Sequence, residues 1–190
     1  MCGRYTGNLD DSEEVRSIYV AVQNDYPSVK LSSGEIFPTN IVPILQKSEW
    51  QLSPIPAKWG YPGFKGSSVI INAKAETAST KPTFSKNFRY NRCIVPTTGY
   101  YEWNKNKEKY LFCYKNSNTV YLGGLYNEYE DGIRFVILTT AANISGAAIH
   151  NRMPIILQDT MLGSWVSDAD FAEWYVHETM PEMMAEKVTV

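Results

Sequence analysis

The stretch RCIVPTTGYYEW, residues 92–103, decides how this chain folds. It joins an apolar, β-branched run to an aromatic run through a Thr-Thr-Gly turn, which is the pattern of two successive strands. From residue 36 to 158 the same texture recurs, because short β-branched and aromatic runs alternate with Gly, Pro, Asn and Ser. The pattern predicts strands at Ile41–Gln46, Ser68–Asn72, Cys93–Pro96, Tyr100–Trp103, Lys109–Tyr114, Val120–Leu125 and Arg134–Thr140.

Helices are expected at both ends of this strand-rich region. Near the N-terminus, Asp10 or Asp11 can cap a helix whose capping-box partner is Glu13 or Glu14. Apolar residues then follow at helical spacing: Val15, Ile18, Tyr19 and Val22. Two short helices, each opened by an acid, are predicted near Thr160–Val166 and Asp168–Val176.

The connections indicate a single domain. Residues Asn116–Asn118 and the pair Asp131-Gly132 are typical of hairpin turns, and the chain contains neither a repeat nor a linker. We therefore predict one α+β domain over residues 1–190, built on a mostly antiparallel, distorted β-barrel-like sheet with a few flanking helices.

Composition excludes several classes of protein. The 190 residues are 44% hydrophobic and 20% charged, which is enough to bury a core and excludes disorder, collagen and coiled coil. No apolar run reaches the roughly 20 residues of a membrane span, and the N-terminus lacks a signal-peptide layout. The three cysteines, Cys2, Cys93 and Cys113, have no CxxC spacing, which argues against a disulfide framework and a zinc site. We expect a cytoplasmic protein with reduced thiols, no metal and no membrane partner.

Charge is distributed unevenly along the chain. The net charge of −2 argues against a nucleic-acid partner. Residues 58–92, however, hold seven cations and a single acid, Glu76, whereas residues 159–190 hold seven acids and a single cation, Lys187. The resulting +6 and −6 segments would give an anion a basic face on a mildly acidic protein. Ordinary solvated surfaces explain the same distribution, so both interpretations stay open.

Cys2 is the first residue that offers chemistry of its own. A cysteine is small enough for the initiator Met1 to be removed, which would leave an α-amine beside the thiol. The reference pKa of an α-amine is about 7.7–8.0 and that of a thiol about 8.5, so both nucleophiles are available near neutral pH. The amine can condense with an aldehyde and the thiol can close a thiazolidine ring, or the thiol can act in hydrolysis with the amine as base. A small residue that merely starts a strand is the structural alternative.

Two further segments carry candidate residues near strand ends. In INAKAET, residues 71–77, Asn72 offers a donor and an acceptor, and Lys74 with a following short helix would favour phosphate. An ordinary helix cap is the alternative for Asn72, and Glu76 is a candidate to pair with a cation. In AAIHNRMPIIL, residues 147–157, His150 and Arg152 lie in a predicted loop, where functional groups concentrate.

Glu102 stands between Tyr101 and Trp103. A carboxylate flanked by aromatic rings is a candidate for desolvation and a raised pKa, as a general acid or base requires. Strand alternation places Glu102 on the face opposite to both rings, however, so the pattern alone favours a solvent-exposed carboxylate.

Four motifs in this order, MCGRY, INAKAET, GYYEW and IHNRMP, resemble the family of SOS response-associated peptidases, or abasic-site processing proteins. The resemblance runs from residue 2 to about residue 157. It implies a single α+β domain around a distorted barrel, which captures abasic sites in single-stranded DNA covalently and shields them from strand cleavage. It implies no cofactor, and we expect a monomer.

The resemblance also implies roles for individual residues. Cys2 would form the thiazolidine with the ring-opened sugar, and Asn72 would hold the N-terminus and the sugar. Glu102 would shuttle protons, including during release of Met1, and His150 would orient the sugar and its phosphate. Phosphate contacts are implied for Arg4, Lys74 and Arg152, and positions lining the site for Pro38, Trp103 and Thr139.

The chain departs from the family pattern at three places. Lys74 stands where Arg is usual, which removes a bidentate fork for phosphate. Phe64 and Lys65 stand where a tryptophan wedge is common, and Asn151 follows His150 where Asp is common. Aromatic residues interleave with the cations of the +6 segment and suggest a single-strand track: Trp59, Tyr61, Phe64, Phe84, Phe88 and Tyr90. A cysteine-dependent peptidase or amidohydrolase and a non-covalent reader of damaged DNA are the alternative functions.

Overall fold

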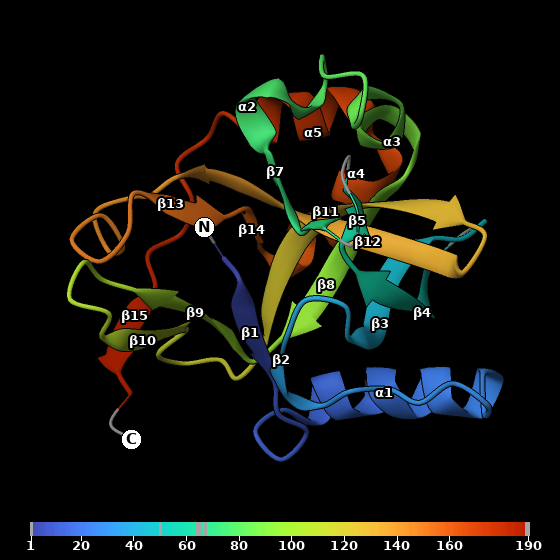
Figure 1. The fold of residues 1–190 in the computed structure, drawn as a ribbon, viewed down its shortest axis with the longest axis horizontal. Coiled ribbons are helices and arrows are strands. Elements are labelled where there is room, and N and C mark those ends of the chain that lie inside the picture. The colour runs from blue at the N-terminus through green and yellow to red at the C-terminus, as the bar shows by residue number, and fades with distance from the viewer. Residues whose placement is uncertain (1, 50, 64–65, 67, 189–190) are drawn as a thin grey trace.

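Two β-sheets form the body of the computed structural model, which describes residues 2–49, 51–63, 66 and 68–188 (Figure 1). The smaller sheet has the strand order β15-β10-β9-β1-β2. Its strands are β1 (Arg4–Gly7), β2 (Gly34–Ile36), β9 (Gly99–Trp103), β10 (Lys109–Cys113) and β15 (Met184–Lys187). Every pairing in this sheet is antiparallel.

The larger sheet closes on itself. Five of its strands pair in a ring in the order β3-β4-β12-β11-β8 and back to β3. They are β3 (Ile41–Lys47), β4 (Leu52–Trp59), β8 (Arg92–Thr97), β11 (Val120–Tyr129) and β12 (Gly132–Ala141). The short strands β7 (Asn72–Lys74), β13 (Arg152–Pro154) and β14 (Ile156–Leu157) extend it, and β5 (Tyr61–Pro62) pairs separately with β6 (Val69–Ile70). The predicted α+β fold with a barrel-like, mostly antiparallel sheet is confirmed, with parallel pairing where β12 meets β4 and β7.

Residues 92–103 connect the two sheets. Strand β8, in which all six residues are buried, belongs to the barrel, and β9 belongs to the smaller sheet. Thr98 lies at the crossing point, where its backbone N–H and its Oγ1 donate to the carbonyl of Thr6 at 2.8 and 3.1 Å. The turn therefore also fixes β1, which begins at Arg4, two residues after Cys2.

One strand prediction was wrong, and the long strand β4 was missed. Residues Ser68–Asn72 do not form one strand. Val69–Ile70 is β6, which pairs with β5, and Asn72 begins β7, which pairs with β12. Strand β4 was not predicted, because Pro54 and Pro56 interrupt its pattern. Strand β4 pairs with β3 along its whole length but with β12 only at Lys58 and Trp59. The two prolines are tolerated because no strand pairs with that second edge of β4 at their positions, so no ladder hydrogen bond is lost there.

Helix α1 (Glu13–Asp25) buries Val15, Tyr19 and Val22, as its spacing predicts. Its cap is Ser12 rather than Asp10 or Asp11, and the Ser12 Oγ accepts the N–H of Val15 at 3.1 Å. The other helices are α2 (Ala75–Ala78), α3 (Ser85–Tyr90), α4 (Leu162–Ser167) and α5 (Ala169–Tyr175). A 3₁₀ turn at Asp159–Met161 directly precedes α4. Figure 1 shows α1 on one side of the sheets and the other helices at the opposite end. None of the helices in the described ranges is both long and apolar enough to cross a bilayer.

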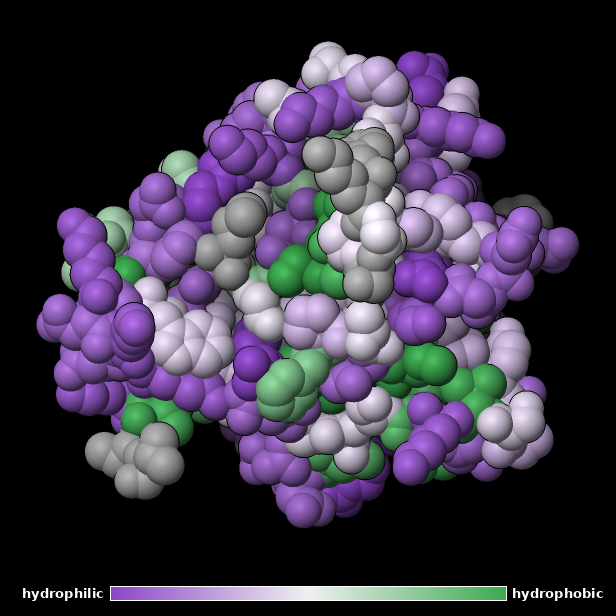
Figure 2. Space-filling view, viewed as in Figure 1, coloured by the Kyte–Doolittle hydropathy of each residue, from purple (hydrophilic) through white to green (hydrophobic). Residues whose placement is uncertain are grey.

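The core fills the barrel and the space between the sheets. Its largest fully buried side chains include Trp59, Tyr5, Tyr100 and Phe135, and the Trp59 ring stacks on that of Phe135 with centroids 6.3 Å apart. On the face shown in Figure 2, polar residues dominate the outline, and apolar residues gather in the middle and at the lower right.

Gly124→Ala is expected to destabilise the barrel. A Cβ at this position of β11 would lie 2.7 Å from the carbonyl oxygen of Val136 and 3.1 Å from the Cys93 Sγ, so the strands would have to move. Overpacking of this kind costs about 1–3 kcal/mol of unfolding free energy, measurable by urea denaturation. Gly163→Ala is the matched control, because nothing lies within 4 Å of its Cβ and alanine favours helix α4. An unchanged midpoint for Gly124→Ala would contradict the close approach.

Candidate functional site at the N-terminus

Cys2 is held at the centre of the candidate site. Its side chain is 0% exposed, and its Sγ donates to the carbonyl of Arg4 at 3.7 Å. Asn72 Nδ2 donates to the Cys2 carbonyl at 2.8 Å. Asn72 begins β7, which pairs in parallel with β12, so the barrel positions the side chain that holds residue 2. Met1 lies outside the described residues.

The thiol of Cys2 is neutral in this environment. Burial raises its pKa well above the usual value, and the nearby Glu102 carboxylate raises it further. Reactive cysteines of peptidases have the opposite property, a lowered pKa that maintains a thiolate. The site therefore supplies a thiol that needs a proton acceptor at the moment it reacts.

Glu102 is buried, and the prediction of an exposed carboxylate was wrong. Only 3% of the residue is exposed, whereas Tyr101 and Trp103 on either side are half-buried. Alternation along β9 places Glu102 on the same face as the buried Tyr100, which is the face that the smaller sheet turns toward the core. Burial raises the pKa of Glu102. A carboxyl with these properties can carry a proton at higher pH than an exposed glutamate.

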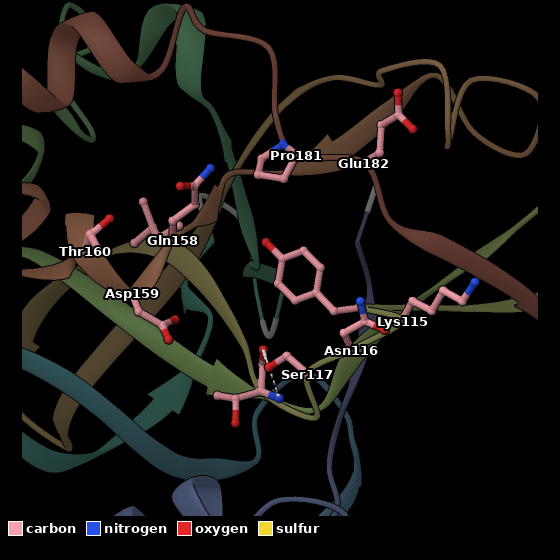
Figure 3. Close-up of a pocket in the computed structure, with 11 residues that line it drawn as sticks. Lys115, Asn116, Ser117, Gln158, Asp159, Thr160, Pro181 and Glu182 are labelled. Carbon is pink, nitrogen blue, oxygen red and sulfur yellow. Dashed lines mark hydrogen bonds between the residues drawn. The ribbon is translucent and has the colours of Figure 1, made fainter.

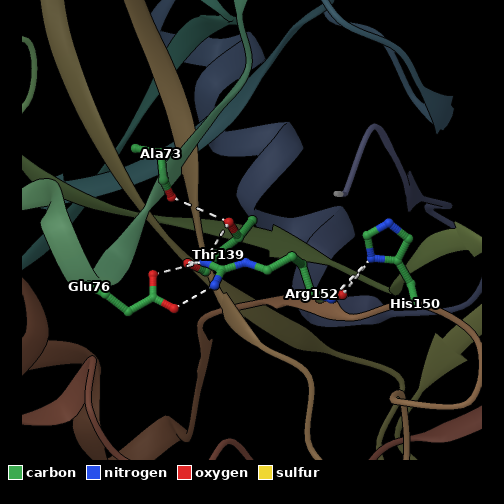
Figure 4. A network of polar contacts seen from close by, with 5 residues as sticks. All are labelled: Ala73, Glu76, Thr139, His150 and Arg152. Carbon is green, nitrogen blue, oxygen red and sulfur yellow. Dashed lines mark hydrogen bonds and ion pairs between the residues drawn. The ribbon is translucent and has the colours of Figure 1, made fainter.

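His150 is oriented by the backbone of Arg152. The Arg152 N–H donates to His150 Nδ1 at 3.0 Å (Figure 4). The same Nδ1 lies 3.3 Å from the Arg152 carbonyl, so both backbone groups of Arg152 hold the ring by Nδ1, with Nε2 at its opposite edge. Figure 4 shows the ring turned away from the Arg152 guanidinium. His150 is close enough to Glu102 to influence its pKa electrostatically, although 48 residues separate them in sequence.

Arg152 forms a clamp that joins three elements of the structure. Its Nη1 and Nη2 donate to Glu76 Oε1 and Oε2 at 2.5 and 2.9 Å, and Nη2 also donates to the Thr139 carbonyl (Figure 4). The hydrogen bonds from Arg152 lower the pKa of Glu76. The expected pairing of Glu76 with a cation is therefore present. Thr139 is 0% exposed and lies beneath the clamp, with its Oγ1 3.5 Å from the Ala73 carbonyl.

Arg4 lies near Glu35, Phe37 and Trp103. Arg4 Nη1 donates to Glu35 Oε1 at 2.8 Å, and the guanidinium lies 3.6 Å from the Phe37 ring centroid and 5.7 Å from that of Trp103. Pro38 lies in the turn after Phe37, where Asn40 Oδ1 accepts the Phe37 N–H. Lys74 ends β7 and is exposed. Arg4 and Arg152, two of the three predicted phosphate contacts, are thus each paired with a carboxylate.

The basic segment 58–92 does not form the predicted track. Arg92 is 2% exposed, and its guanidinium donates to backbone carbonyls of α3 and α4, so it is a structural cation. Lys58 pairs with Asp131. The aromatic residues Trp59, Tyr61, Phe84 and Phe88 are buried, which leaves Tyr90 exposed among those that the structure describes. Phe64 and Lys65 lie outside the described residues.

Part of the acidic segment 159–190 lies beside part of the basic segment 58–92. Asp170 and Glu173 of α5 line a hollow of about 470 Å³ together with Lys86 and Arg89 of α3. Ser79 Oγ also donates to Glu173 Oε1 at 3.1 Å. The opposite charges of residues 58–92 and 159–190 therefore partly neutralise each other at one end of the molecule.

Two polar residues near Arg4, Glu35 and Lys109, were not predicted from the sequence as part of the site. Lys109 Nζ donates to the same Glu35 oxygen that binds Arg4, at 2.5 Å. The signal that could have found them is strand pairing, since Lys109 is opposite Trp103 in the β9–β10 register. Such a register depends on contacts between distant segments and cannot be read from local periodicity.

Another hollow lies away from these residues. It has a volume of about 590 Å³ between the β10–β11 loop and the residues after β14, and Tyr114, Asp159 and Glu182 are among its lining (Figure 3). None of the ten predicted site residues lines it. Within the described ranges, no three His, Cys, Asp or Glu side chains group closely enough to hold a metal ion.

The comparison with known families decides the classification. The model of the SOS response associated peptidase (SRAP) family matches residues 1–190. The chain belongs to the SRAP family. Among curated SRAP relatives, the abasic site processing protein YoqW of Bacillus subtilis is 33% identical over 188 residues, covering 88% of this chain and 80% of the relative. The abasic site processing protein YedK of Escherichia coli is 26% identical over 176 residues, covering 87% and 79%.

Solved structures show the same SRAP fold. A crystal structure of a protein from Bacteroides thetaiotaomicron superposes with a TM-score of 0.78 at 24% identity, covering 99% of this chain and 92% of the other. A protein from Bordetella bronchiseptica gives 0.76 at 22% identity over the full length of both chains. These likenesses establish the fold of this SRAP chain.

Proposed function

We propose that this protein processes abasic sites in single-stranded DNA by forming a covalent thiazolidine crosslink through Cys2 once Met1 has been removed. The observation that carries the proposal is the fixed position of residue 2. Asn72 binds its carbonyl at 2.8 Å while its thiol is buried beside Glu102. Membership of a family whose curated relatives are named abasic site processing proteins supports the choice of lesion.

The chemistry follows from the two nucleophiles of an N-terminal cysteine. An abasic site is an aldehyde in equilibrium with a closed hemiacetal. The α-amine adds to the aldehyde carbon, and loss of one water gives an imine. The thiol then adds across the imine: a C–S bond forms, its proton passes to the nitrogen, and a five-membered ring results. The amine reacts first, because the thiol closes the ring on the imine carbon that the amine has formed.

The neighbouring side chains have distinct roles in this scheme. Glu102, whose pKa burial raises, donates a proton during hemiacetal opening and water loss and accepts the thiol proton in ring closure. His150, held by the Arg152 backbone through Nδ1, orients the sugar oxygens. Arg4, Lys74 and Arg152 contact phosphates, and Pro38, Trp103 and Thr139 shape the site. Arg4 and Arg152 must then share phosphate with the carboxylates that hold them.

Removal of Met1 is a precondition of this reaction. An amine in a peptide bond cannot condense with an aldehyde, so hydrolysis of the Met1–Cys2 bond must come first. We assign Glu102 as the proton shuttle for this self-processing step, in which one water is consumed and the Cys2 amine is released. Mass spectrometry of the N-terminus measures the step directly.

Cys2→Ala is expected to abolish crosslinking. Processed protein is incubated with a single-stranded oligonucleotide that carries one abasic site, and the products are resolved on a denaturing gel. Wild type should give a shifted band, and Cys2→Ala should give none because both the thiol and the thiazolidine are lost. Cys113→Ala is the matched control: it removes another free, partly buried thiol and should crosslink normally.

Other outcomes point to other functions. A shifted band of undiminished intensity with Cys2→Ala would refute the thiazolidine. Cys2-dependent cleavage of peptides without any DNA adduct would indicate a peptidase or amidohydrolase. Salt-sensitive DNA binding that is unaffected by Cys2→Ala, without a covalent band, would indicate a non-covalent reader.

A further inference from the structure

A group of cationic and aromatic side chains shares the outer face of the smaller sheet. In the strand register Arg4 is opposite Tyr101, and Lys109 is opposite Trp103. Because side chains alternate along a strand, these four residues lie on one face, while Tyr100 and Glu102 lie on the buried face. We call this set, together with Glu35 and Phe37, the Glu35 cluster.

One carboxylate oxygen holds both cations of the Glu35 cluster. Glu35 Oε1 accepts from Arg4 Nη1 at 2.8 Å and from Lys109 Nζ at 2.5 Å. Partial burial opposes ionisation of Glu35, but the hydrogen bonds from Lys109 and Arg4 outweigh it and lower the pKa. The three groups therefore carry a net charge of +1 at neutral pH. Their side chains are 26%, 20% and 34% exposed for Arg4, Lys109 and Glu35, so an anion in solution can reach them.

Aromatic rings surround the two cations. The Arg4 guanidinium lies 3.6 Å from the Phe37 ring centroid, and Lys109 Nζ lies 3.9 Å from that of Tyr101. The Trp103 centroid is 5.7 Å from Arg4 and 5.8 Å from Lys109. Phe37 remains 44% exposed despite its contact with Arg4. Such rings are platforms on which the bases of a single strand can stack.

We propose that the Glu35 cluster binds the single strand that flanks the lesion, and that Lys109 contacts a phosphate while Glu35 limits the affinity. The proposal rests on the proposed function, because it places the strand next to Cys2. Stacking rings combined with cations that follow the backbone are how single strands are held without sequence readout. The Lys109 ammonium has three donors, of which Glu35 uses one, so it can bind the carboxylate and a phosphate together.

Glu35 acts on DNA in two opposing ways. It holds Arg4 and Lys109 in place, which preorganises both cations. Its negative charge also repels phosphate and competes for the same donors. Because the Phe37 and Tyr101 rings also hold the two cations, Glu35 contributes more repulsion than positioning, so affinity for undamaged DNA stays low and covalent capture decides where the protein remains.

The test measures binding of an undamaged, fluorescein-labelled single-stranded oligonucleotide by anisotropy at several salt concentrations. Lys109→Met keeps the aliphatic stem but removes one phosphate contact, so affinity should fall about 5-fold at 0.1 M salt and the log–log salt slope should shrink by about 0.7. Glu35→Gln should raise the affinity several-fold. Thermal melts of each variant establish that it is folded.

The Asp131 cluster provides matched controls. Asp131 Oδ2 also binds two cations through one oxygen, Lys58 at 3.2 Å and Arg134 at 2.5 Å. Lys58→Met and Asp131→Asn therefore make the same charge changes at a similar arrangement elsewhere, and both should leave the affinity unchanged. If they alter it as much as the Glu35-cluster variants do, the effect is one of net charge and the inference is overturned.

The two proposals fail separately. If wild type crosslinks an abasic oligonucleotide while Lys109→Met and Glu35→Gln bind undamaged DNA as wild type does, the proposed function stands and this inference falls. If the variants shift affinity as expected but no covalent band forms with wild type, the binding surface stands and the crosslinking proposal falls.

Discussion

Glu102→Gln is expected to slow crosslinking to an abasic site by about 10²- to 10⁴-fold, the range of general acid–base contributions. Glutamine keeps the size of the buried side chain but can neither donate the proton for water loss nor accept the thiol proton. The rate is measured from the appearance of the covalent band. Each protein is prepared with Cys2 freed by cleavage of an N-terminal tag, so that Met1 removal does not limit the result.

The pH dependence separates this role from a structural one. Burial raises the pKa of Glu102, so its proton is retained above the ordinary glutamate value of about 4.3 and is lost only as the pH rises through the raised pKa. For steps in which Glu102 acts as an acid, the crosslinking rate of the wild type should fall as the pH rises through this raised pKa. Glu102→Asp should keep a pH-dependent limb with partial activity, whereas Glu102→Gln should lose it. A Gln variant with the wild-type profile would exclude Glu102 as the proton shuttle.

Arg92→Met is expected to produce the largest loss of stability among the cations of residues 58–92. The Arg92 guanidinium donates to the carbonyls of Phe88, Arg89, Trp165 and Val166, which joins α3 to α4. A buried acceptor left without its donor costs about 1–3 kcal/mol, while removal of a buried charge offsets part of the loss. We expect the unfolding free energy to fall by about 3 kcal/mol and the melting temperature by about 6–12 °C.

Arg89→Met is the matched control for this prediction. Arg89 lies three residues before Arg92, in α3, and its side chain is exposed, so its substitution should change stability by less than about 0.5 kcal/mol. Affinity of the folded Arg92→Met protein for single-stranded DNA should equal that of wild type. A stable Arg92→Met protein that has lost DNA binding would restore the idea of a basic track along residues 58–92.

Local patterns predicted much of the fold because they depend on neighbouring residues. β-branched and aromatic runs located β3, β8, β9, β10, β11 and β12, and the Asp131-Gly132 pair located the β11–β12 hairpin. Strand β4 was missed because prolines normally interrupt a strand, and these two are acceptable only because β12 pairs with β4 at just Lys58 and Trp59. The Ser12 cap was missed because several residues before α1 can cap equally well in sequence, and the fold selects one.

The candidate site divides in the same way. The order of the four motifs by itself indicated the SRAP family and the residue types for aminothiol and proton chemistry. The tertiary structure alone decided that Glu102 is buried, that Arg152 is clamped by Glu76, and that Glu35 joins Arg4 to Lys109. The physical reason is that burial and ion pairing depend on which strands lie side by side, and the paired groups are 76, 31 and 74 residues apart. Sequence spacing determines which face of a strand a side chain occupies, but only the packed sheets determine what that face meets.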